Sequence, residues 1–67
     1  MNRIERLKAL AAQERKLTAE VIQLLLEVER SKEHLDRGYS SMFDFCVKEL
    51  GYSEGCAARR VNAMRLY

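Results

Sequence analysis

The chain lacks most of the residues that stabilise small extracellular domains or bind metals. It has no proline and no tryptophan, one histidine and two cysteines among 67 residues. Cys46 and Cys56 do not form a CxxC pair, and together with His34 their spacing fits no zinc motif. We therefore expect no metal, no cofactor and no disulfide. Cys46 is expected to be a small buried apolar side chain, with Cys56 nearer the surface.

The scarcity of histidine also argues against catalysis. A Ser–His–Asp or Cys–His arrangement would have to use His34, which lies in the charged stretch 31–37. We expect this histidine on the surface near the end of a helix. The sequence therefore predicts a non-catalytic protein, with no small-molecule substrate evident.

Long apolar runs are missing as well. None approaches the roughly 20 residues that cross a bilayer, and no signal-peptide pattern precedes the charged start. We expect a cytoplasmic protein with reduced cysteines and no membrane partner. A chain this short buries only about 60% of its unfolded surface, and small domains compensate with disulfides, metals or oligomerisation. Because disulfides and metals are not expected here, we expect the domain to be stabilised by oligomerisation or by a neighbouring domain.

The first half of the chain has the periodicity of a helix. Residues 2–34 contain neither glycine nor proline. Apolar residues recur there at helical spacing in two neighbouring rows, one interrupted by Glu14 and Thr18. The rows are Ile4, Leu7, Ala11, Val21, Leu25 and Val28, and then Leu10, Leu17 and Leu24. The pattern predicts one long amphipathic helix over about 2–34. A helical hairpin broken near residue 13 is the alternative, but no turn residue stands there.

The middle of this predicted helix is apolar on nearly every side, through Val21, Ile22, Leu24, Leu25 and Leu26. Such a helix has to be covered all round, and the remaining residues can cover only one face. We infer a homodimer. The expected interface is formed by Leu7, Val21, Ile22, Leu24, Leu25 and Val28.

The second half predicts two short helices. Residues 36–40 form a loop in which Gly38 takes a left-handed conformation, and Ser40 or Ser41 caps a helix over about 41–50. Its buried stripe is expected to be Phe43, Cys46, Val47 and Leu50.

Gly51 ends that helix, and Ser53 caps the last one, over about 54–66. Ala57, Val61 and Met64 face inward. The fold class is therefore all-α, a single helical domain over residues 1–67.

The turn Leu50–Gly51–Tyr52–Ser53 gives these two helices a resemblance to the helix-turn-helix family, in which the second helix lies in the DNA major groove. One departure is Arg60, which stands where that family has a branched apolar residue; Val61 follows one step later. The candidate contacts to double-stranded DNA are Ser53, Arg59, Arg60, Asn62 and Arg65. Alternatively, these arginines face solvent or a protein partner.

A second resemblance covers nearly the whole chain. The strings Gly38–Cys46, Leu50–Glu54 and Ala57–Arg60 are similar to the N-terminal helical region of a group of bacterial HNH endonuclease proteins. In that group a nuclease domain follows, but none of its catalytic histidines or its asparagine maps onto this chain. The resemblance implies a non-catalytic DNA-binding accessory module acting through the last helix. The alternative is a homodimerisation or protein-interaction module without direct DNA contact.

Overall fold

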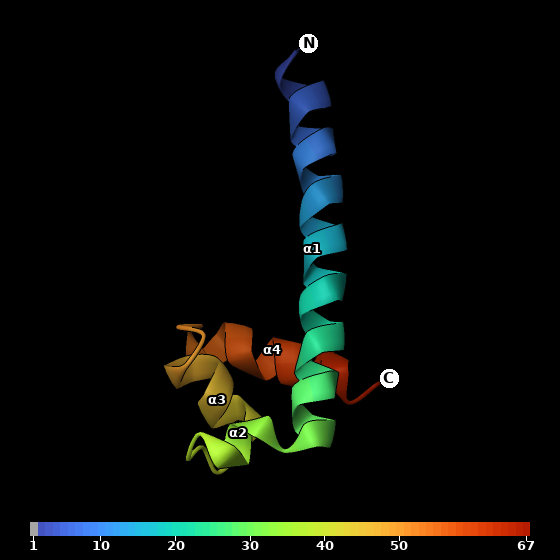
Figure 1. The fold of residues 1–67 in the computed structure, drawn as a ribbon. Helices are drawn as coiled ribbons and strands as arrows, with labels where there is room; N and C mark the ends of the chain where they lie inside the picture. The colour runs from blue at the N-terminus through green and yellow to red at the C-terminus, as the bar shows by residue number, and fades with distance from the viewer. Residues whose placement is uncertain (1) are drawn as a thin grey trace.

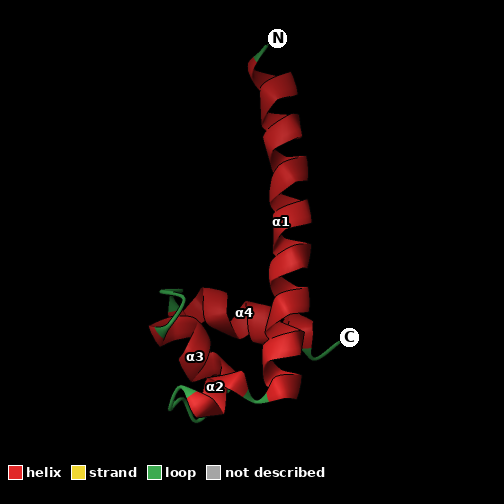
Figure 2. Cartoon of the chain, viewed as in Figure 1, coloured by secondary structure: helices red, strands yellow, loops and turns green. Residues whose placement is uncertain are grey.

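The computed structural model describes residues 2–67, and these residues form helices joined by loops, without a strand (Figures 1 and 2). The order is α1 (Arg3–Ser31), α2 (Glu33–Asp36), α3 (Met42–Lys48) and α4 (Glu54–Met64). The all-α prediction is confirmed. No helix within residues 2–67 has the length and apolar character needed to cross a bilayer.

The first helix is continuous through residue 13, so the hairpin alternative is wrong. Alanine, leucine and long charged side chains favour it throughout, and Asn2 caps it by accepting the backbone N–H of Glu5 at 2.8 Å. It ends at Ser31, earlier than predicted. Lys32 takes a left-handed conformation (φ 66°) and its N–H donates to the carbonyl of Glu29 at 3.2 Å.

The chain then turns into the short helix α2, which was not predicted as a separate element: residues 33 and 34 were expected at the end of the first helix and residue 36 in the following loop. This turn reverses the expectation for His34, which is only 6% exposed. The physical reason is the bend at Lys32, a residue type that gives no turn signal. It folds α2 back so that its one histidine lies inside the molecule.

Helices α3 and α4 are shorter than predicted, by two residues at the end of each. Their caps are as expected: the hydroxyl of Ser41 accepts the N–H of Asp44 at 3.0 Å, and that of Ser53 accepts the N–H of Cys56 at 3.2 Å. Gly38 and Gly51 both have positive φ, at 92° and 75°. The turn chemistry of the second half is therefore confirmed.

The buried face of α3 differs from the prediction. Met42, Phe45 and Cys46 are buried and Val47 is half-buried, whereas Phe43 and Leu50 are 39% and 43% exposed. Leu50 lies beyond the end of the helix at Lys48, so it cannot continue a helical stripe.

One core joins the lower part of α1 to α3 and α4. The inward positions of α4 are confirmed, and the members of the core are Ile22, Leu25, Met42, Phe45, Cys46, Ala57, Val61 and Met64. All of them come from residues 21–67, which we call the head. Residues 3–20 of α1, the arm, project from it without a neighbour (Figure 1), and the molecule measures 47 × 21 × 17 Å.

Candidate interaction surfaces

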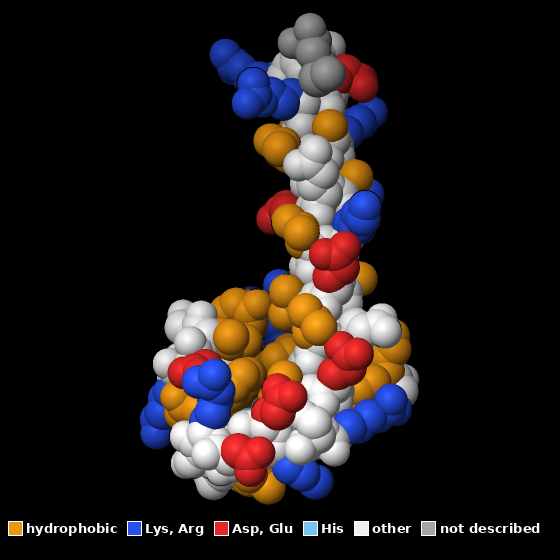
Figure 3. Space-filling model, in the orientation of Figure 1, with side chains coloured by type: hydrophobic (Ala, Val, Ile, Leu, Met, Phe, Trp, Pro, Cys, Tyr) orange, Lys and Arg blue, Asp and Glu red, His pale blue; other side chains and the backbone are white. Residues whose placement is uncertain are grey.

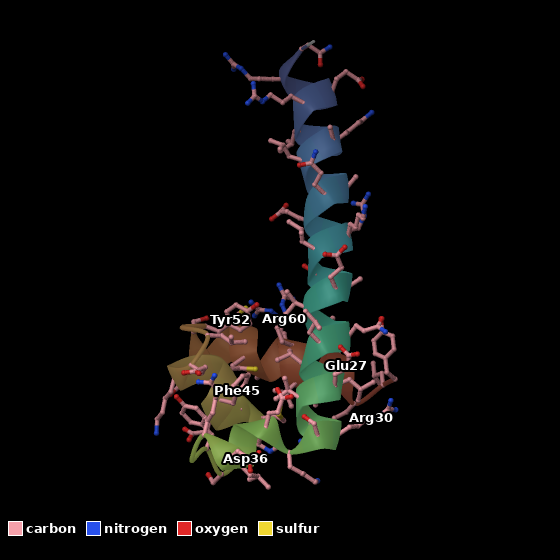
Figure 4. The ribbon with its side chains drawn as sticks, viewed as in Figure 1. Glu27, Arg30, Asp36, Phe45, Tyr52 and Arg60 are labelled. Atoms are coloured by element: carbon pink, nitrogen blue, oxygen red, sulfur yellow. The ribbon has the colours of Figure 1, made fainter. Side chains whose placement is uncertain are left out.

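The five candidate DNA contacts all lie on α4 or beside it, but they do not form one cluster. Ser53, Arg59 and Asn62 are exposed, as the sequence predicts. Arg65 is exposed too, yet its Nη1 lies 3.5 Å from Oε2 of Glu29 on α1. Arg60 is half-buried and comes from the side of α4 that faces α1 (Figure 4).

Arg60 is poorly satisfied in this position. Its Nε is buried and has no hydrogen-bond partner among the described residues. A buried donor without a partner lowers the free energy of unfolding. The aliphatic stem of Arg60 can offset this cost by packing against its neighbours. Arg60 is therefore less accessible than Arg59 and Asn62, which are exposed.

The head as a whole is not a basic surface. Residues 21–67 contain seven lysines and arginines and seven aspartates and glutamates, so the formal net charge of +2 belongs to the arm. Ion pairs also neutralise several basic groups: Arg37 to Glu49 at 2.7 Å and Lys48 to Asp44 at 3.1 Å. Arg59 is exposed and forms none of these ion pairs, so the surface around Arg59 and Asn62 is available for an anion.

Glu49 is the centre of a small polar network outside the core. Besides the ion pair with Arg37, its Oε2 accepts the hydroxyl of Tyr39 at 3.1 Å. This hydrogen bond to a carboxylate raises the pKa of Tyr39 above its ordinary value of 10.0. The Tyr39 ring also packs edge-on against Phe45, with centroids 5.7 Å apart. The network fixes the loop after α2 on α3, which is a structural role.

The two cysteines differ in burial. Cys46 and Cys56 are free thiols, and no group of three metal-ligating side chains occurs within residues 2–67. Cys46 is fully buried, and burial raises its pKa, with a smaller contribution from Cys56. A thiol that keeps its proton is a poor nucleophile.

The expected dimer residues divide into two sets. Ile22 and Leu25 lie in the core of the single chain, so they are not surface residues, and this part of the expectation is corrected. The head covers their face of α1 with α3 and α4. Val21 and Val28 are half-buried, while Leu7 and Leu24 are 63% and 61% exposed.

The exposed members belong to a longer apolar row, which we call the seam. It consists of Leu7, Leu10, Leu17, Val21, Leu24 and Val28, with Glu14 as its one charged position. Their spacing alternates between three and four residues, which is the pattern of a coiled-coil interface. Leu10 and Leu17 also belong to this row, although they were not among the expected dimer residues; the three–four spacing is the signal that includes them.

The seam continues into an apolar groove on the head, with a volume of about 220 Å³. Val21, Leu24, Leu25 and Val28 form its α1 wall. Phe45, Leu50 and Tyr52 form the opposite wall, and hydrophobic side chains surround the hollow where the head meets α1 (Figure 3). Leu50 is thus exposed at the rim of a groove instead of buried in the core.

No family model, no curated protein and no solved structure matches the chain. The resemblance to the N-terminal region of HNH endonuclease proteins stays a prediction.

Proposed function

We propose that this chain is an assembly module that pairs with a second copy of itself through the free face of α1. The supporting observation is the seam on a projecting helix, where leucines such as Leu7, Leu17 and Leu24 are at least 60% exposed. Large contiguous apolar surfaces of this kind mark interaction sites in monomeric folds. A helix arm without tertiary contacts also gains stability from pairing.

The test is the molar mass in solution. Wild-type protein should sediment as a dimer at micromolar concentration. Leu17→Glu places a charge in the seam, and it should give a monomer with unchanged head packing, because Leu17 contacts nothing in the core. Ala12→Glu adds the same charge on the opposite side of the arm and should leave the dimer intact. A wild-type monomer at all accessible concentrations would refute the proposal.

A second candidate function is DNA contact through α4, in the manner of an accessory module of an HNH endonuclease protein. The observation that favours it is the exposure of Arg59 and Asn62 on a helix that follows a tight, serine-capped turn. The neutral head argues for weak binding. Arginine and asparagine side chains of such helices contact phosphates and base edges.

Salt dependence tests this candidate. Few phosphate contacts per chain give a slope of log affinity against log salt no steeper than about −5 for a dimer. Arg59→Ala should flatten the slope, whereas Lys16→Ala on the arm removes the same charge away from α4 and should matter less. Absence of a mobility shift in low salt would leave assembly as the sole function.

A further inference from the structure

The groove on the head and the seam along α1 share Val21, Leu24 and Val28, so they form one continuous apolar surface. This inference rests on the proposed self-assembly and adds its geometry. In the heptad notation of coiled coils, Leu7, Glu14, Val21 and Val28 occupy a positions, and Leu10, Leu17 and Leu24 occupy d positions. The head packs on the neighbouring face, at Ile22 and Leu25.

We propose that two copies pair as an antiparallel coiled coil in which the arm of each chain lies in the groove of the other. The a and d positions then face each other in mixed layers. Leu7 meets the partner's Leu24, Leu10 meets the partner's Val21, and Glu14 meets the partner's Leu17. Ile4, 60% exposed on the arm, falls beside the partner's Leu25, between the groove walls.

Charge favours this orientation over a parallel one. In a parallel pair, identical a positions face each other, so Glu14 would oppose the partner's Glu14 inside the apolar seam, and two like charges at that distance repel. In the antiparallel pair each Glu14 lies opposite the partner's Leu17, so the two glutamates lie in adjacent layers instead of facing each other. The antiparallel pair also brings Arg6 beside the partner's Glu27, since both flank the seam on the same side, and this attractive pair occurs twice in the dimer.

Charge and apolar contact also select the register of the antiparallel pair. A shift of one heptad in one direction places Glu20 opposite the partner's Glu20. A shift in the other direction leaves Leu24 and Val28 of the groove wall uncovered. Of the three registers, only the one proposed above both covers the groove and pairs Arg6 with the partner's Glu27.

A parallel dimer would also leave the grooves unfilled. The two heads would lie side by side, with both arms projecting together and Ile4 far from any groove. In the antiparallel dimer Leu7 and Leu10 of the arm lie opposite apolar residues of the partner, and Leu17 lies opposite the partner's Glu14. The second copy therefore matches this surface in length, apolar content and charge.

Cross-linking tests the orientation. Single cysteines are introduced in a Cys56→Ser background, where Cys46 stays unreactive in the core. A mixture of Leu7→Cys and Leu24→Cys chains should form a disulfide heterodimer, whereas Leu7→Cys alone should form little. A Leu7→Cys homodimer as the main product would refute the antiparallel arrangement, although a dimeric mass would still support self-assembly.

A charge exchange gives an independent measurement on the uncross-linked protein. Arg6→Glu and Glu27→Arg should each weaken dimerisation about five-fold or more, because two attractive pairs become repulsive. The double variant should recover to within about two-fold of wild type, and Lys16→Glu is the control for the change in net charge. Failure of the double variant to recover would overturn the proposed register. A wild-type monomer would instead refute self-assembly itself.

Discussion

His34 and Cys46 are both buried, but they enter the core in different ways. Cys46 is at an inward position of α3 that its helical spacing predicted. His34 is buried because the backbone turns at Lys32, and its Nδ1 has no hydrogen-bond partner within residues 2–67. A lysine in the left-handed region carries no sequence signal, so the surface position predicted for His34 was wrong.

The two cysteines should differ in reactivity. A thiol reporter should label Cys56 rapidly in the folded protein, since it is only half-buried, and should label Cys46 only as the chain unfolds. In denaturant without reductant both should react, giving two thiols per chain. Rapid labelling of both in the folded state would contradict the buried position of Cys46.

Alkaline pH should destabilise the fold through the same thiol. Burial holds the pKa of Cys46 above its ordinary value of 9.0, so the folded chain keeps this proton at a pH where the unfolded chain has lost it. The free energy of unfolding is then constant below the ordinary thiol pKa and falls as pH rises through it. Tyr39, whose pKa is also raised, acts in the same direction at higher pH.

Thermal melts across this range check the prediction, with Cys46→Ala as the comparison. The variant should lose stability overall but show a shallower decline with pH. An equal decline in both proteins would assign the effect to Tyr39 or to other groups.

At the level of elements, the turns of the second half depend on two serines. Ser41→Ala and Ser53→Ala each remove the acceptor of a helix N-cap and should cost about 0.5–2 kcal/mol of unfolding free energy. Ser40→Ala, one residue before the first cap, is the control and should change little. Denaturant titration measures all three, and equal stabilities would contradict the cap geometry.

The two glycines around α4 should respond oppositely to alanine. Gly51 has φ 75°, where a side chain is strained, so Gly51→Ala should destabilise by about 1 kcal/mol. Gly55 lies within α4, and an added Cβ would meet only the end of Arg59 at 3.6 Å. Because Gly55 is the second residue of α4, Gly55→Ala should stabilise by about 0.5 kcal/mol, the lower end of the effect in helix interiors. Stabilisation by both substitutions would show that Gly51 does not require its left-handed conformation.

The ends of α3 and α4 could be predicted from the sequence, but which of their side chains are buried was harder to predict. The serine caps, Gly38, Gly51 and the inward face of α4 follow from residues adjacent in sequence. The buried face of α3 depends on how α1 and α4 approach it, and spacing alone placed Phe43 and Leu50 inside. Ile22 and Leu25 were predicted to lie in a dimer interface. Their apolar character shows that they are covered, but not whether a second chain or the chain's own helices cover them.

For the whole molecule, the proposed dimer has a consequence for the second candidate function. Leu25, where the head packs on α1, would lie at the same level along the coiled coil as the partner's Arg6, on the other flank of the seam. The two heads are then about 30 Å apart along the coiled coil, at 1.5 Å per residue. Both heads lie on the same face, because the core residues of α1 occupy equivalent positions on either side of the two-fold axis. Half-sites of dimeric helix-turn-helix proteins are about 34 Å apart.

DNA binding through α4 should therefore depend on the arm, because the arm links the two heads. Two linked heads bind more tightly than one, so Leu17→Glu should lower the affinity for a duplex of several helical turns by about tenfold or more. For a duplex of a single turn, which reaches only one head, wild type and variant should bind alike. Titration of both duplexes with both proteins, together with Ala12→Glu as the dimeric control, separates these effects. Equal binding of the long duplex by the monomeric variant would mean that each head acts alone and that assembly serves another purpose.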